Sequence, residues 1–148
     1  MDNSKQNIIN QIAQKLDCGY DCYYNPKTNE LITIPNFGRL WDEDEFRKSF
    51  AAELKKVTKN KSDFIKFEVL ESFESFKIME RFIAQIPDKQ FQLELENILV
   101  RKKPFQNFKN RIDYSVYRQN WFDFKQRDLE KIVETQLNRR KANTQHDN

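Results

Sequence analysis

Histidine, glycine, proline and cysteine are scarce in this sequence, and each shortage argues against a class of fold or function. The single His, His146, lies close to the C-terminal end, so we do not expect catalysis by a histidine base or a histidine-containing triad. With 2 Gly and 4 Pro, the chain has neither a Gly-rich phosphate-binding loop nor the turns of a β-sandwich. The two cysteines, Cys18 and Cys22, are too few for a secreted disulfide framework.

Long hydrophobic runs are also lacking. No apolar stretch of the sequence approaches the roughly 18 residues that a membrane-spanning helix needs. The first five residues are polar and do not open into the apolar core of a signal peptide. We therefore expect a cytoplasmic protein that does not insert into a membrane.

Aromatic and charged residues are abundant instead. The 148 residues include 13 Phe, 5 Tyr and 2 Trp, and 33% of them are charged, which gives a mean hydropathy of -0.91. So many rings are not typical of a disordered chain, and the length suits one domain. We predict a single domain over residues 1–137, with parts 1–71 and 72–137, and a disordered tail over 138–148.

The N-terminal part alternates between helical and extended patterns. A helix is predicted from apolar residues at helical spacing, which are Ile8, Ile9, Ile12, Ala13 and Leu16. Gly19 suits the left-handed position that ends such a helix. A hairpin follows, with strands over 20–24 and 31–34 around the turn residues 25–29. Alternation over residues 64–69 predicts a third strand in one antiparallel sheet.

The remaining residues read as helices. A second helix is predicted to open at Trp41–Glu45, with Asp42 and Glu45 as a capping box, and to continue past Phe50. From Ser72 onward only helices are expected, separated at Pro87 and Pro104 and ending with a long helix that begins near Ser115. The predicted fold is therefore α+β: a small three-stranded antiparallel sheet with N-terminal helices, followed by a mostly helical C-terminal half.

Three elements resemble a bacterial family, uncharacterised protein family 0158. They are Met79-Glu80-Arg81-Phe82-Ile83, Phe105-Gln106-Asn107-Phe108-Lys109 and Trp121-Phe122-Asp123-Phe124, and the hairpin around Tyr23–Glu30 is also similar. The sequence departs from the family pattern where Lys102-Lys103-Pro104 stands in place of a Gly-containing segment. The resemblance covers most of the chain and implies an architecture but no activity.

Candidate chemical sites are weak. Cys18 and Cys22 supply two of the four ligands of a structural zinc site, and no second Cys pair exists, so no metal or other cofactor is predicted. The acidic run Asp42–Glu45 is explained by a helix start, where carboxylates are favoured. We predict no catalytic residues, and an enzyme that uses carboxylates and arginine ranks last among the alternatives.

Charge is distributed unevenly along the chain. Residues 101–141 hold 12 Lys and Arg against 5 Asp and Glu, whereas residues 1–100 hold 14 against 17. Such asymmetry suggests an anionic partner. If the basic third forms a binding surface, the candidate residues are Lys102, Lys103, Lys109, Arg118 and Arg127.

Two interpretations of this basic third stay open. In one, Phe105, Phe108 and Trp121 fill the core between helices and the cations face water. In the other, these rings stack on the bases of a nucleic acid whose phosphates the cations neutralise. We favour the first and predict a non-catalytic accessory or regulatory protein that binds a protein partner or a second copy, with nucleic-acid binding as the alternative.

Overall fold

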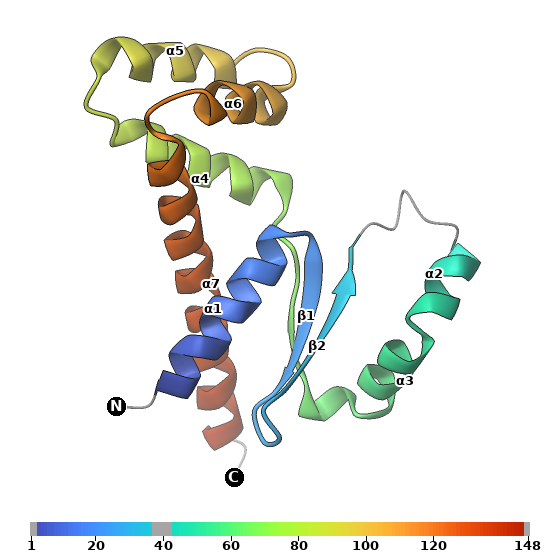
Figure 1. The fold of residues 1–148 in the computed structure, drawn as a ribbon. Coiled ribbons are helices and arrows are strands. Elements are labelled where there is room, and N and C mark those ends of the chain that lie inside the picture. Colours follow the sequence, from blue (N-terminus) through green and yellow to red (C-terminus); the bar gives the residue numbers. More distant parts are fainter. Residues whose placement is uncertain (1–2, 37–42, 147–148) are drawn as a thin grey trace. The chain divides into compact units, whose positions relative to one another are not determined.

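The computed structural model describes residues 3–36 and 43–146 and divides into two units (Figure 1). Unit 1 combines residues 1–69 with 129–148, and unit 2 spans residues 70–128. The elements, in chain order, are α1 (Asn3–Asp17), β1 (Tyr20–Asn25), β2 (Glu30–Pro35), α2 (Glu43–Ser49), α3 (Ala51–Lys59), the 3-10 helix η1 (Lys61–Asp63), β3 (Ile65–Phe67), α4 (Ser72–Ala84), α5 (Lys89–Leu99), α6 (Pro104–Asp113) and α7 (Arg118–His146). The predicted α+β class is confirmed.

Helix α1 forms where the sequence predicts it. All five residues of its predicted apolar stripe are buried, and Gly19 takes the positive φ of 92° after the helix ends. Glycine reaches this conformation without a steric penalty. The Cys22 Sγ lies 3.9 Å from the carbonyl oxygen of Ile12, so α1 covers the face of the sheet that carries Cys22.

The sheet of unit 1 has the strand order β2-β1-β3, and both pairings are antiparallel. The turn between β1 and β2 is held by the Asn25 side chain, whose Oδ1 accepts hydrogen bonds from the backbone N–H of Lys27 (2.9 Å) and Thr28 (3.3 Å). Asn29 adopts a left-handed φ of 64°, which asparagine tolerates better than most residues. The predicted hairpin and third strand are thus confirmed.

The prediction of one continuous second helix is wrong. Two helices, α2 and α3, meet at Phe50, whose backbone (φ -118°, ψ 24°) leaves the helical region. Phe50, Leu54 and Val57 pack against Ile32, Ile34 and Phe64 on the sheet face opposite α1 (Figure 1). The apolar residues keep helical spacing across the break, so their pattern alone predicts one helix where the structure has two. Trp41 and Asp42, predicted to start this helix, lie outside the described residues.

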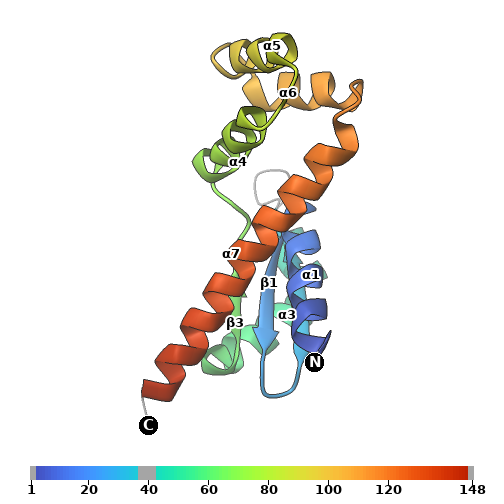
Figure 2. The same ribbon diagram turned by 90° about the vertical axis from the view of Figure 1, so that its left-hand side faces the viewer.

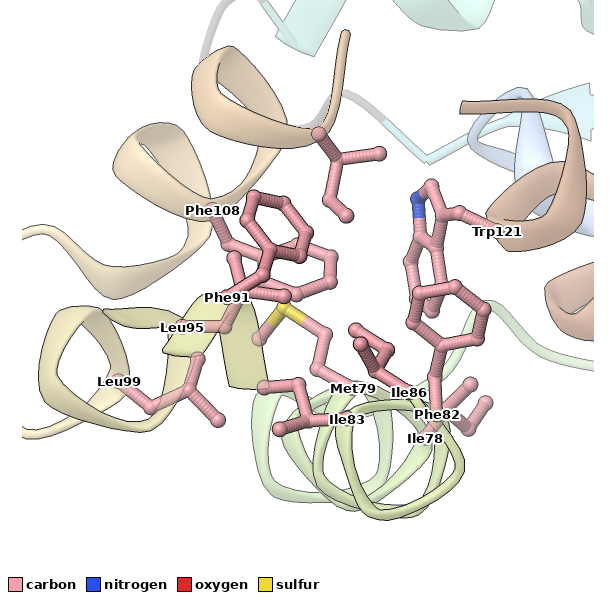
Figure 3. Packing of buried hydrophobic residues seen from close by; sticks show 11 residues of the cluster. Ile78, Met79, Phe82, Ile83, Ile86, Phe91, Leu95, Leu99, Phe108 and Trp121 are labelled. Atoms are coloured by element: carbon pink, nitrogen blue, oxygen red, sulfur yellow. The ribbon is translucent and has the colours of Figure 1, made fainter. Parts of the chain in front are cut away.

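Unit 2 consists of helices around an aromatic core. Asp88 caps α5, because its carboxylate accepts hydrogen bonds from the backbone N–H of Gln90 and Phe91. Figure 3 shows the core between α4, α5, α6 and the start of α7. Its buried members are Ile78, Met79, Phe82, Ile83, Ile86, Phe91, Leu95, Leu99, Phe108, Ile112 and Trp121.

Helix α7 belongs to both units, with residues 118–128 in unit 2 and the remainder in unit 1. In unit 1, Leu129, Val133 and Leu137 are buried at a four-residue spacing, the pattern of a helix packed along one side. The Lys5 Nζ donates a hydrogen bond to the Asn138 Oδ1 at 2.9 Å, which joins this part of α7 to α1. The helix is described through His146, past the predicted start of the tail at residue 138. The division into a single domain and a tail stays a prediction.

Among the described residues, none of the helices is both long and apolar enough to cross a membrane.

Candidate functional site

Unit 1 contains a groove of about 1030 Å³. It lies where the C-terminal end of α3, η1 and β3 face the second half of α7, and Figure 2 shows β3 between β1 and this part of α7. The lining residues are Tyr23, Val57, Thr58, Lys59, Lys61, Ser62, Phe64, Ile65, Lys66, Gln136, Arg139 and Arg140. We call it the basic groove, because five of these residues are cationic and none is acidic.

Local sequence explains how α3 delivers two of these cations. Lys59 lies in the last turn of α3, where a positive charge is favoured by the helix dipole. Asn60 then caps the helix through its backbone N–H, which donates to the Lys56 carbonyl at 3.2 Å. The short η1 carries Lys61 and turns the chain directly into β3. A helix exit followed by a tight turn thus presents both lysines at one end of the groove.

Two acidic residues near these cations are paired, Asp63 with Lys27 outside the groove lining and Glu68 with the groove cation Lys66. Asp63 lies 4.0 Å from the Lys27 Nζ, and Glu68 lies 3.1 Å from the Lys66 Nζ. Desolvation acts to lower the pKa of Lys66, but the interactions with Glu68 and with Tyr23, whose ring lies 5.7 Å from the ammonium, raise it above its ordinary value. Lys66 is therefore charged at neutral pH.

Three groove cations have no acidic partner in the part of the chain that the structure describes. Lys59, Lys61 and Arg139 are exposed, and no ion pair within the described residues involves them. Because like charges at close range repel, such a cluster is stabilised when an anion binds between them. The groove is thus electrostatically suited to a negatively charged ligand.

The five cations predicted from the sequence all lie in unit 2. Lys102 and Lys103 precede α6, and Lys103 has a left-handed φ of 54°. Lys109 is exposed on α6. Arg118 lies 3.7 Å from the Asp113 carboxylate and 4.8 Å from the centre of the Phe122 ring, and the Arg127 Nε donates to the Asp123 carbonyl at 3.4 Å.

These five residues do not share one helix face. Arg118 and Arg127 are nine positions apart on α7, and a helix with 3.6 residues per turn places them on opposite sides. Lys103 lies before α6 with a left-handed backbone, so it does not share a helix face with Lys109. The sequence-predicted set stays a prediction, but no single helix surface presents it.

The rings of the C-terminal third divide between core and surface. Trp121 and Phe108 are buried, with 7% and 1% of their surface exposed, and their ring centroids lie 5.0 Å apart at 78° (Figure 3). For both, the prediction of a core role is confirmed. It is wrong for Phe105, which is 42% exposed and contacts Phe76 edge-on at 6.3 Å. Phe105 lies only one residue into α6, before the buried stripe of that helix begins.

The basic groove was missed at the sequence level for a clear reason. Lys59 and Lys61 are explained by a helix exit, and Arg139 and Arg140 fall where the sequence predicts a fraying tail. The two pairs are separated by more than 70 residues of sequence, and only the return of α7 into unit 1 brings them together. Counting charges along the sequence does not reveal that these residues lie close together in the folded chain.

The cysteines have unlike environments. Cys18 is exposed and Cys22 is buried. Burial raises the pKa of the Cys22 thiol to about 12, the negative charge of Asp21 acts in the same direction, and Lys15 opposes both. Cys22 is thus protonated and unreactive at neutral pH, since the thiolate is the nucleophile and the metal ligand. Within the described residues, no three His, Cys, Asp or Glu side chains gather as a metal site.

Comparison with known families gives a match over most of the chain. Residues 4–145 match the family described as Uncharacterised protein family (UPF0158), in agreement with the resemblance carried by the Met79, Phe105 and Trp121 elements. No curated protein and no solved structure matches the chain.

Proposed function

The chain belongs to Uncharacterised protein family UPF0158. We propose that it is a non-catalytic accessory or regulatory protein of the cytoplasm that binds an anionic partner in the basic groove. The observation that carries the proposal is the composition of the groove lining, with five cations and no acid. Oppositely charged surfaces steer encounter and select partners.

The test uses two double variants that change the charge equally. Lys61→Glu with Arg139→Glu alters the groove, and Lys103→Glu with Arg118→Glu alters the predicted cations of unit 2. All four side chains are exposed, so both variants should fold. Binding is measured by fluorescence anisotropy with a labelled oligoglutamate and a labelled single-stranded oligonucleotide, in salt from about 50 to 200 mM, where phosphate-type contacts weaken steeply.

The two outcomes separate the candidates. We expect the groove variant to bind the tighter probe at least about tenfold more weakly, a change of about 1.4 kcal/mol, and the unit 2 variant to bind like the original protein. The proposal would be overturned if neither probe bound at the lowest salt. It would also be overturned if the groove variant bound the tighter probe as strongly as the original protein.

The alternative is a nucleic-acid-binding surface made of Lys102, Lys103, Lys109, Arg118 and Arg127. Exposure of all five side chains favours it, whereas the opposite placement of Arg118 and Arg127 and the burial of Trp121 and Phe108 weaken it. In the same experiment, loss of oligonucleotide binding by the unit 2 variant alone would establish the alternative.

A further inference from the structure

We propose that the basic groove receives an extended acidic segment of a partner protein, which adds to the sheet as a strand beside β3 and places its carboxylates against the groove cations. This inference rests on the proposed function and names the class of partner. It combines two observations: the backbone edge of β3 and the charge of the residues around it.

The edge of β3 is open on the side away from β1. The strand order β2-β1-β3 makes β3 an outer strand.

The backbone N–H of Asn36 donates to the Gly19 carbonyl at 2.8 Å, and the N–H of Asn29 donates to the Asn25 carbonyl at 2.8 Å. Both bonds show that the odd-numbered residues of β1 direct their backbone groups toward β2.

The alternation of antiparallel strands then determines which backbone groups of β3 are available. The even-numbered residues of β1, Cys22 and Tyr24, direct their backbone groups toward β3, where they pair with Phe67 and Ile65. Lys66 lies between these two pairs, so its N–H and C=O point to the outer edge. An outer edge with unpaired backbone groups is a template for strand addition.

The groove runs along this same edge. Its lining combines three consecutive residues, Phe64, Ile65 and Lys66, with Gln136, Arg139 and Arg140 of α7. A strand laid beside β3 would therefore lie between the sheet edge and α7. Its alternate side chains are about 6.6 Å apart on one face, so successive carboxylates can meet successive cations.

The available rings favour a peptide over a nucleic acid. Single strands of nucleic acid are bound through exposed rings on which bases stack. The two rings of the groove lining are unsuited to this, because Phe64 is only 6% exposed and the Lys66 ammonium lies over the ring of Tyr23. Cations combined with a free strand edge instead match an extended acidic peptide.

The decisive experiment compares two peptides of identical charge and sequence with the full-length protein. The first peptide is an acetylated, amidated octapeptide of alternating Glu and Val. The second has the same sequence, but it is methylated at the backbone nitrogen of every second residue, those whose N–H groups would face β3. We expect the N-methylated peptide to bind at least about tenfold more weakly, because it cannot donate backbone hydrogen bonds to the Lys66 carbonyl. Equal affinity of the two peptides would overturn strand addition.

A single-stranded oligonucleotide of equal charge provides the third arm. Tighter binding of the oligonucleotide than of the unmodified peptide, lost in the Lys61→Glu/Arg139→Glu variant, would overturn the peptide assignment but uphold an anion-binding groove. Failure of all probes at low salt would overturn the proposed function itself. The two failures are thus distinguishable.

Amide hydrogen exchange locates the added strand. The Lys66 amide should exchange rapidly in the free protein and at least about tenfold more slowly with the peptide bound, since its N–H gains a partner. Unchanged exchange at Lys66 under saturating peptide would contradict the inference.

Discussion

Units 1 and 2 place their cations differently. In unit 2, Arg81, Arg111 and Arg118 pair with the carboxylates of Asp128, Glu94 and Asp113 at 2.6, 2.6 and 3.7 Å, and Arg111 and Arg118 also lie over rings. In unit 1, cations from α3, η1, β3 and α7 gather around one groove without an acid in the lining. The number of cations in a segment thus does not indicate which of them gather around one groove.

The two cores differ as well. Unit 2 is held by rings in contact, with Phe82, Phe108 and Trp121 within 5.0 to 5.3 Å of one another in two pairs. The sheet of unit 1 is covered by aliphatic side chains from α1 on one face and α3 on the other. We therefore expect the loss of a ring to lower the stability of unit 2, and the loss of groove cations to weaken binding by unit 1.

The largest expected effect is the loss of the central ring of unit 2. Trp121→Ala should lower the free energy of unfolding by about 3–5 kcal/mol, because it leaves a cavity between α4, α6 and α7. Urea denaturation followed by circular dichroism measures this loss. Tyr114→Ala, at a side chain that is 89% exposed, is the matched control and should be nearly neutral. A loss below about 1 kcal/mol for Trp121→Ala would show that the ring is not part of the core.

The second effect concerns the buried thiol of unit 1. Burial raises the pKa of Cys22 from an ordinary value of 9.0 to about 12 in the folded protein. Its contribution to the free energy of unfolding is therefore complete below pH 9 and is lost as the pH rises toward 12. The slope for one group is about 1.4 kcal/mol per pH unit.

Cys22→Ala removes this titration. We expect the stability difference between the original protein and the variant to shift toward the variant between pH 8 and pH 10. Other groups that titrate in this range are common to both proteins and cancel. A difference that stays constant with pH would mean that the thiol is accessible to water in the folded state.

A smaller effect is expected at the start of α5. Asp88→Ala removes the acceptor of two backbone N–H groups and should cost about 1 kcal/mol. Asp88→Asn keeps an acceptor at the same place and should lose less. If both variants are equally destabilised, the carboxylate acts by its charge and not as a cap.

The smallest effect is expected for the cations predicted from the sequence. Lys103→Glu with Arg118→Glu should change the free energy of unfolding by less than about 1 kcal/mol, because exposed ion pairs contribute little. The melting temperature of the double variant measures this. A larger loss would show that these cations stabilise unit 2 and that their variant is a poor control for binding.

Local sequence patterns, both apolar and polar, were enough to predict most of the elements. The α1 stripe, the turn at Asn25–Asn29 and the Asp88 cap are short-range features, and all three are confirmed. The break at Phe50 was not predictable, because Phe46, Phe50 and Leu54 keep helical spacing while the backbone leaves the helix between them. That choice depends on how α3 packs on the sheet.

The candidate site was beyond sequence reasoning for a different reason. The groove joins residues near position 60 with residues near position 140, and no local pattern relates them. The resemblance to the family extends over both segments but carries no site. Only the folded structure, in which both segments line one groove, brings Lys61 and Arg139 together.

The most direct test of the difference between the two units is a titration of ¹⁵N-labelled protein with the acidic peptide, followed by amide chemical shifts. The account predicts shifts that saturate at Lys61, Lys66 and Arg139, with those of Lys102 and Lys109 unchanged. Saturating shifts at Lys102 and Lys109, with the groove amides unmoved, would contradict it.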